Sequence, residues 1–264
     1  MADPAPTSPS EVPFAIERSP LLEDVSHGFF GSARGAHQFG FGGPGDPEEI
    51  RALRNAAAGA ILPGAPIQTP HQVHSPEVIT ISKVTDKKWP DHAKDRPVAD
   101  AVVTDRTDIV VGIVTADCGP VLFADREAGV VGAAHAGWRG AHNGVLENTV
   151  SAMEALGATR PNIVAVLGPT IAQPSYEVDA KFYENFAREE AMHFAAAGVR
   201  DGKERWQFDL PGYILARLRH AGLSTISILG RDTCTESEAY YSYRRAVQSS
   251  EPDYGRQLTA ISPG

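Results

Sequence analysis

The sequence predicts a single α/β domain built around a mixed β-sheet. In the first half of the chain, several strand-like segments follow one another with no helix between them. In the second half, segments with apolar residues at three- and four-residue spacing alternate with short apolar runs, and these patterns are typical of helices and strands respectively. No internal repeat or linker divides the chain, so we expect a flexible arm over residues 1–12 and one domain over residues 13–264.

The first half is expected to hold one helix among several strands. Asp46 has the chemistry of a helix N-cap, and Pro47 suits the first helical position. The helix should continue to about Ala60, because Pro63 and Gly64 follow it. Strands are expected at residues 27–30, 78–84, 101–104, 109–114 and 129–134.

The second half is expected to alternate helices with strands. Residues 145–156 carry apolar side chains on one helical face, and Gly157 is the expected stop. Asp179 is the expected N-cap of a helix that runs to about Ala197. The remaining expected elements are a helix at residues 211–221 and strands at residues 163–167, at residues 225–229 and close to the C-terminus.

Composition and charge exclude several classes of protein. The chain has 264 residues and a net charge of −9, which argues against nucleic acid or an anionic membrane as a partner. It has no apolar run long enough to cross a membrane, and its two cysteines cannot build a disulfide framework, so we expect a cytoplasmic protein. A lone G-x-G-x-x-G match at residues 40–45 lacks a preceding strand and is interpreted as a loop.

Residues 109–140 hold the strongest functional signal. One apolar run leads to Thr-Ala-Asp-Cys, which ends at Cys118, and the next leads to His-Ala-Gly-Trp-Arg-Gly, which begins at His135. Because binding residues tend to lie where a strand gives way to a loop, we expect Cys118 and His135 at neighbouring strand ends that face one cleft. A third donor, His74, ends a Gln-Val-His segment upstream. Two imidazoles and one thiolate with a fourth position open are the composition of a catalytic zinc site.

Several motifs together resemble the YfiH-like laccase-domain family. They are Gln-Val-His, Thr-Ala-Asp-Cys-Gly-Pro-Val, His-Ala-Gly-Trp-Arg-Gly, Leu-Gly-Pro-Thr-Ile with a later Tyr-Glu-Val, and Tyr-Tyr-Ser-Tyr-Arg-Arg. The likeness covers about residues 27–261. It implies a four-layer α-β-β-α sandwich, and it selects His74 as the third ligand in place of His71. Members of this family are described as polyphenol oxidases and as purine nucleoside phosphorylases with adenosine deaminase activity.

Four residues outside the ligand set are candidates for binding substrate. Arg139 stands just before a helix that we expect to start near His142, and a guanidinium beside a helix N-terminus suits phosphate. Arg139 can alternatively pair with a structural carboxylate, since arginine suits either partner. The resemblance adds Gln72, Tyr241 and Arg244, which lie within its motifs.

The leading functional hypothesis is a zinc-dependent purine nucleoside enzyme. Zinc held by His74, Cys118 and His135 would support phosphorolysis of adenosine- or inosine-type nucleosides to base and ribose 1-phosphate, with adenosine deamination as a further activity. Asp117 is the carboxylate nearest to these ligands in sequence and is the candidate acid or base. The expected partners are a nucleoside and phosphate, and the chain is expected to be a monomer or a homodimer.

Three alternatives use the same residues differently. The first is a copper-dependent polyphenol oxidase, which the nine histidines and the absence of any H-x-H pair disfavour. The second is a metal-free cysteine hydrolase with Cys118 as nucleophile and His135 as base. The third is a metal-binding module without catalysis.

Overall fold

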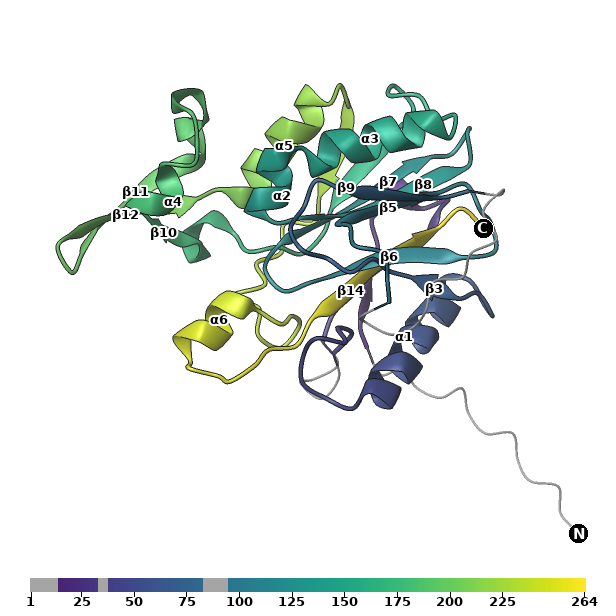
Figure 1. Cartoon of the computed structure of the whole chain (residues 1–264), viewed down its shortest axis with the longest axis horizontal. Helices are drawn as coiled ribbons and strands as arrows, with labels where there is room; N and C mark the ends of the chain where they lie inside the picture. The colour runs from purple at the N-terminus through teal and green to yellow at the C-terminus, as the bar shows by residue number, and fades with distance from the viewer. Residues whose placement is uncertain (1–13, 33–37, 83–94) are drawn as a thin grey trace, which may run out of the picture.

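Four layers, in the order helix, sheet, sheet, helix, make up the body of the protein (Figure 1). The computed structural model describes residues 14–32, 38–82 and 95–264. A six-stranded sheet packs face to face against a five-stranded sheet, and each sheet carries helices on its outer face. The layered sandwich implied by the resemblance is therefore confirmed, whereas the arm expected over residues 1–12 lies outside the described residues.

The five-stranded sheet brings the last strand of the chain into its centre. In spatial order it consists of β1 (Ile16–Glu17), β2 (Ser26–Phe30), β14 (Gln257–Ser262), β6 (Val110–Thr115) and β3 (Ile67–Gln68). Its outer face is covered by α1 (Pro47–Ile61). The Asp46 side chain accepts hydrogen bonds from the backbone N–H groups of Glu48 and Glu49, which confirms the predicted N-cap.

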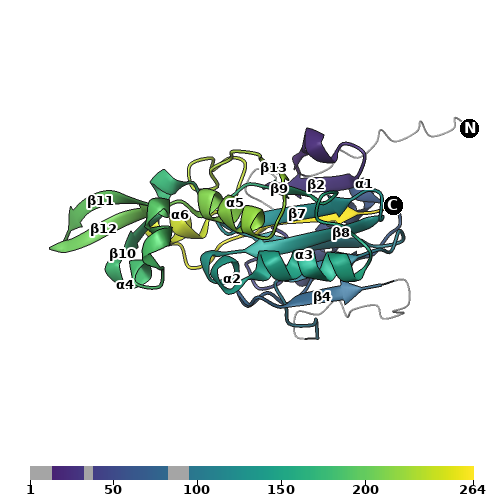
Figure 2. The same cartoon turned by 90° about the horizontal axis from the view of Figure 1, so that it is seen from above.

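The six-stranded sheet is mixed, as the sequence predicted. In spatial order it consists of β13 (Thr225–Ile228), β9 (Val164–Leu167), β7 (Gly119–Asp125), β8 (Val130–Ala136), β5 (Ala101–Thr104) and β4 (Val78–Ile81). The two outer pairs, β13–β9 and β4–β5, are parallel, and the inner pairs are antiparallel. Its outer face carries α2 (Trp138–Asn143), α3 (Val145–Ala155) and α5 (Leu210–His220), as Figure 2 shows from above.

Strands β7 and β8 form the centre of the core. In β7, Val121 and Phe123 pack toward α3 and α5, whereas Leu122 packs toward the five-stranded sheet. Because both faces of such a strand are buried, consecutive side chains are apolar and the sequence shows a continuous apolar run. Because β7 and β8 are antiparallel, the start of β7 lies beside the end of β8, with Pro120 opposite His135. The predicted ligands gather where β7 begins and β8 ends.

A small antiparallel sheet projects from the body and corrects one prediction (Figure 1). The helix expected from Asp179 to about Ala197 is wrong: Asp179 does cap a helix, but α4 (Ala180–Tyr183) has only one turn. The chain then folds into β11 (Phe194–Arg200) and β12 (Lys203–Phe208), and β10 (Glu177–Asp179) pairs with β12. Folding back places the rings of Phe182 and Phe194 against Phe208, so aromatic packing overrides the helical propensity of this segment.

The remaining elements are short, and one of them bears on the site. The 3-10 helices are η1 (Pro20–Leu22), η2 (Gln173–Ser175) and η3 (Arg188–His193), and a last helix, α6 (Tyr243–Gln248), precedes β14. Ser242 is the N-cap of α6, because its side chain accepts a hydrogen bond from the Arg245 N–H. Within the described ranges, no helix combines the length and the apolar character needed to cross a membrane.

Candidate functional site

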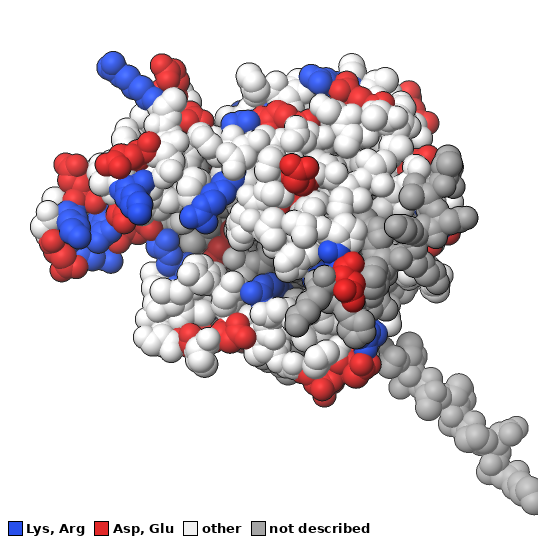
Figure 3. All heavy atoms as spheres, in the orientation of Figure 1, with Lys and Arg blue, Asp and Glu red and all other residues white. Residues whose placement is uncertain are grey.

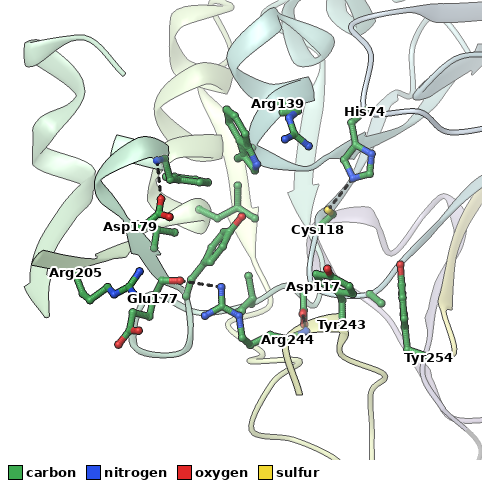
Figure 4. A pocket seen from close by; sticks show the side chains of 17 residues that line it. His74, Asp117, Cys118, Arg139, Glu177, Asp179, Arg205, Tyr243, Arg244 and Tyr254 are labelled. Carbon is green, nitrogen blue, oxygen red and sulfur yellow. Dashed lines mark hydrogen bonds between the residues drawn. The ribbon is translucent and has the colours of Figure 1, made fainter. Parts of the chain in front are cut away.

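The three predicted ligands lie together. The metal-binding atoms of His74, Cys118 and His135 are all within 4.8 Å of one another, and the Cys118 Sγ is 3.7 Å from the His74 Nε2 (Figure 4). His135 is in β8, Cys118 lies in the turn between β6 and β7, and His74 lies in the segment after β3. Zinc bonds of about 2.0–2.3 Å separate tetrahedral ligand atoms by about 3.5 Å. The donor types suit a metal ion such as zinc, and their separations of at most 4.8 Å are close to what one ion requires.

A buried carboxylate that the sequence analysis missed organises this cluster. Asp100 is fully buried just before β5. Its Oδ1 accepts a hydrogen bond from His135 Nδ1 at 2.7 Å and one from the backbone N–H of His74 at 2.9 Å. Its Oδ2 accepts bonds from the backbone N–H groups of Val73 and Ser75 and from the Ser75 hydroxyl. One carboxylate thus fixes the ring of one ligand and the backbone of another, as metal-binding histidines commonly require.

The side chains of Cys118 and His74 leave no room for a side chain at Gly137, directly after β8. A Cβ at this position would lie 2.8 Å from Cys118 Sγ and 2.9 Å from His74 Cδ2. His74 itself has a backbone φ of 63°, in the left-handed region that residues other than glycine rarely adopt. Both features hold the side chains of His74 and Cys118 close together, and strained backbone of this kind is frequent at functional sites.

The electrostatics of the cluster favour a thiolate. Burial by itself would raise the pKa of the Cys118 thiol, but the charge of His135 and hydrogen bonds from His135 and His74 outweigh burial and lower that pKa to about 6. For His135, burial opposes the charged form, and the attraction of Cys118 together with the hydrogen bond to Asp100 raises the pKa. A thiolate is the form of cysteine that binds metals and acts as a nucleophile.

A cavity of about 590 Å³ opens beside the cluster (Figure 4). Its volume lies in the range of small-molecule sites. The lining combines the ligands His74 and Cys118 with aromatic rings, arginines and acids. The rings are those of Trp138, Tyr176, Phe182, Tyr243 and Tyr254, the arginines are Arg139, Arg205 and Arg244, and the acids are Asp117, Glu177 and Asp179. Figure 3 shows Lys and Arg side chains around the hollow between the projecting sheet and the body. The cavity therefore offers stacking surfaces and cations within reach of the cluster.

Asp117 lines this cavity, but its carboxylate is engaged in holding loops together. Its Oδ1 accepts a hydrogen bond from the Thr233 hydroxyl, and its Oδ2 accepts bonds from the Ser242 hydroxyl and the Arg244 backbone N–H. Burial raises its pKa, and these three hydrogen bonds oppose the rise. The Asp117 carbonyl oxygen accepts a further bond from the Thr170 hydroxyl. These contacts tie the turn that carries Cys118 to the segments around the cavity.

Arg139 faces the cavity, but the helix beside it differs from the prediction. The helix expected to start near His142 begins at Trp138, directly after β8, and α2 has only six residues. Arg139 is therefore in the first turn of the helix and not ahead of it. The Arg139 guanidinium carbon lies 4.7 Å from the centre of the Trp138 ring. Among the described residues, no carboxylate forms an ion pair with Arg139, so its alternative assignment as a structural partner is not supported.

The other predicted substrate residues differ in their surroundings. Arg244 lines the cavity, where it donates to the Glu177 carbonyl and lies 5.4 Å from the Tyr176 ring centre. Gln72 instead exchanges two hydrogen bonds with the backbone of Val114 in β6, which holds the segment of His74 against the sheet.

Tyr241 is not among the residues that line the cavity. Its backbone exchanges hydrogen bonds with the Gln257 side chain, and its ring lies against Gly255. The rings that do reach the cavity from this part of the chain are those of Tyr243 and Tyr254. Of the two residues predicted in this segment, Arg244 lines the cavity and Tyr241 does not.

Comparisons with known proteins agree with this arrangement. Residues 24–263 match the model of the family described as multi-copper polyphenol oxidoreductase laccase. The purine nucleoside phosphorylase YfiH of Escherichia coli strain K12 is 40% identical over 203 residues, which is 76% of each chain. The purine nucleoside phosphorylase RP494 of Rickettsia prowazekii is 34% identical over 193 residues, 72% of this chain and 75% of that one.

Solved structures support the fold over nearly the whole length. The Neisseria meningitidis protein NMB0706 is 28% identical and superposes with a TM-score of 0.76, covering 95% of this chain and 98% of that one. YlmD from Geobacillus stearothermophilus superposes with a TM-score of 0.78 at 22% identity, covering 92% and 93% of the two chains. The second likeness concerns the fold alone. The resemblance predicted from the motifs is confirmed by these matches.

Proposed function

This chain belongs to the multi-copper polyphenol oxidoreductase laccase family, and from that premise we propose that it is a zinc-dependent purine nucleoside phosphorylase. The observation that carries the proposal is the cluster of His74, Cys118 and His135 in contact with a cavity of about 590 Å³ lined by aromatic rings and arginines. Two relatives, matched over about three quarters of their length, are named purine nucleoside phosphorylases. Their names support the substrate class.

The donor set favours zinc over a multi-copper centre. Two imidazoles and one thiolate leave a fourth position open, as catalytic zinc sites do. Bound zinc would supply a Lewis acid that polarises a substrate oxygen. Among the described residues, this is the one group of three or more His, Cys, Asp or Glu side chains arranged to hold a metal ion, whereas a multi-copper oxidase needs several such groups. Asp100 then serves as a positioning residue, because it fixes the ring of His135 and the backbone of His74.

The large cavity is the proposed nucleoside site. Trp138, Tyr176 and Tyr243 offer aromatic faces, and stacking on such faces is a common way to bind a purine. Arg139 and Arg244 supply donors, and an arginine fork matches the O6 and N7 acceptors of a 6-oxopurine. Two of the three acids in the wall are engaged elsewhere, since Glu177 pairs with Arg200 and Asp179 caps α4. We assign Asp117 a positioning role, because both of its carboxylate oxygens already accept hydrogen bonds.

Exchange of Arg139 for lysine tests its assignment to the nucleoside. Arg139→Lys keeps the positive charge but loses the planar fork, and we expect the KM for inosine to rise about tenfold, the equivalent of one charge-assisted hydrogen bond of about 1.4 kcal/mol. The KM for phosphate should change much less. Steady-state kinetics with each substrate varied in turn measures both values.

Arg160→Lys is the control for this experiment, because Arg160 lies on the surface in an ion pair with Glu154. It should leave both KM values unchanged. The sequence analysis placed phosphate at Arg139, and a rise in the phosphate KM with an unchanged inosine KM would restore that assignment and contradict the one made from the structure.

The reaction class is tested by supplying nucleosides with and without phosphate. Purified protein loaded with zinc should convert inosine, guanosine or adenosine to free base and ribose 1-phosphate only when phosphate is present. Release of inosine and ammonia from adenosine without phosphate would show deamination, for which zinc held by the same cluster would supply a Lewis acid. Turnover of a polyphenol with oxygen uptake, in protein that holds copper, would replace the proposal with an oxidase.

A further inference from the structure

A second, smaller cavity meets the first one at the cluster. It has a volume of about 240 Å³ and shares His74, Ala116, Cys118 and Tyr254 with the larger cavity as wall residues. His135 also lines it. Molecules in the two cavities can therefore approach each other beside the three ligands. This volume is ample for an ion such as phosphate.

Three arginines from distant segments line this smaller cavity. Arg54 lies in α1, Arg96 lies ahead of β5, and Arg256 directly precedes β14. None of the described residues in its wall is acidic, although the chain as a whole carries a net charge of −9. A concentration of like charge in a partly buried wall costs free energy, which a bound anion offsets.

Arg54 and Arg96 share two contacts in this wall. Arg54 Nη2 and Arg96 Nη1 both donate to the Thr69 hydroxyl oxygen. The ring of Phe41 lies 4.9 Å from the guanidinium carbon of Arg54 and 5.7 Å from that of Arg96. The guanidinium carbon of Arg256 lies 4.5 Å from the centre of the Tyr254 ring. These contacts orient the guanidinium groups.

Several polar atoms in this wall have no partner among the described residues. They are Arg96 Nε, Arg256 Nη1 and Thr115 Oγ1, and each is buried. Buried donors nearly always have an acceptor, because leaving one unsatisfied costs about 1–3 kcal/mol. These buried donors belong to side chains that line the cavity, and guanidinium and hydroxyl groups are donors suited to the oxygens of a tetrahedral anion.

We propose that the smaller cavity binds a tetrahedral oxyanion through Arg96 and Arg256, and that during catalysis this anion is the inorganic phosphate substrate. The second part rests on the proposed function. A phosphate oxygen then forms a bond to C1′ of the ribose at the junction of the two cavities as the bond from C1′ to the purine nitrogen breaks. The electron pair of that bond leaves with the purine, which takes up one proton from solvent, and ribose 1-phosphate remains.

Binding of inorganic phosphate to the zinc-loaded protein tests the proposal. Isothermal titration calorimetry should detect phosphate binding in the wild type. Arg256→Gln removes one guanidinium and should weaken that binding about tenfold or more, as the loss of a charge-assisted contact predicts. Gly42→Glu is a second variant that leaves the arginines in place: a Cβ at Gly42, in the same wall, meets nothing within 4 Å. The added carboxylate should weaken phosphate binding by a similar factor.

Matched controls carry the same charge changes elsewhere. Arg160→Gln removes a surface guanidinium, and Gly59→Glu adds a carboxylate on α1 where a Cβ also meets nothing within 4 Å. Both should bind phosphate as the wild type does. In the phosphorolysis assay, Arg256→Gln and Gly42→Glu should raise the phosphate KM and leave the inosine KM nearly unchanged.

The outcomes separate this inference from the proposed function. Phosphate binding that both cavity variants weaken, in a protein that cleaves no nucleoside, would support the anion site and reject the phosphorylase. Phosphorolysis with a phosphate KM that neither variant changes would support the phosphorylase and reject the anion site. Absence of phosphate binding by the wild type, or equal loss in the control variants, would overturn the inference.

Discussion

Cys118→Ala is expected to lower the zinc content from about one per chain to a small fraction of that value, and to abolish phosphorolysis. The Cys118 Sγ is one of only three donors in the cluster. Removing it should cost several kcal/mol of metal affinity, since complete four-ligand zinc sites bind with about 10–16 kcal/mol. Metal analysis of protein dialysed against a weak chelator measures the loss.

Cys234→Ala is the matched control for Cys118→Ala. Cys234 is the other free cysteine of the chain, is similarly half-buried, and does not belong to the cluster. This variant should keep its zinc and its activity. Full zinc occupancy in Cys118→Ala would show that the cluster is not the metal site. Zinc loss in His71→Ala, with retention in His74→Ala, would show that the neighbouring histidine is the ligand.

Asp100→Asn is expected to have the second largest effect, although Asp100 touches no substrate. An amide cannot accept all the hydrogen bonds that reach this carboxylate from His135 and from the His74 segment. Loss of such a partner of a metal-binding histidine lowers metal affinity about 10–100-fold. Each buried donor left without an acceptor should also cost about 1–3 kcal/mol of unfolding free energy.

A second buried aspartate separates these two effects. Asp125 is equally buried, and its carboxylate accepts hydrogen bonds from the backbone N–H groups of Ala128 and Thr159. Asp125→Asn should lower the unfolding free energy while its zinc affinity stays unchanged. Zinc titrations together with urea unfolding measure both quantities. Equal zinc affinity in Asp100→Asn and the wild type would mean that Asp100 acts on stability alone.

The sequence predicted the ligands because each one lies in a distinctive local pattern. Cys118 follows the apolar run that forms the buried strand β6. His135 follows a second apolar run, and both belong to the buried strand β8. Strand β7 was missed because it begins with Gly119 and Pro120, a dipeptide typical of a turn. The pairing of β7 with β8 brings Cys118, just before β7, next to His135, near the end of β8.

Asp100 and the second cavity could not be predicted from local pattern. Asp100 is a single acid ahead of a strand, and its importance lies in contacts with residues 25 to 35 positions away. The arginines of the smaller cavity come from three segments that only the packed sheets bring together. In the same way, residues 180–197 have strong helical propensity, and only the aromatic contacts to Phe208 show why the chain turns back there.

The dependence of inosine phosphorolysis on zinc tests the central claim most directly. Protein stripped of metal by a strong chelator should lose its phosphate-dependent cleavage of inosine, and activity should return in proportion to added zinc and saturate at one zinc per chain. Cys118→Ala should not recover at the same zinc concentration. Full phosphorolysis by metal-free wild-type protein, or recovery only with copper, would contradict the account.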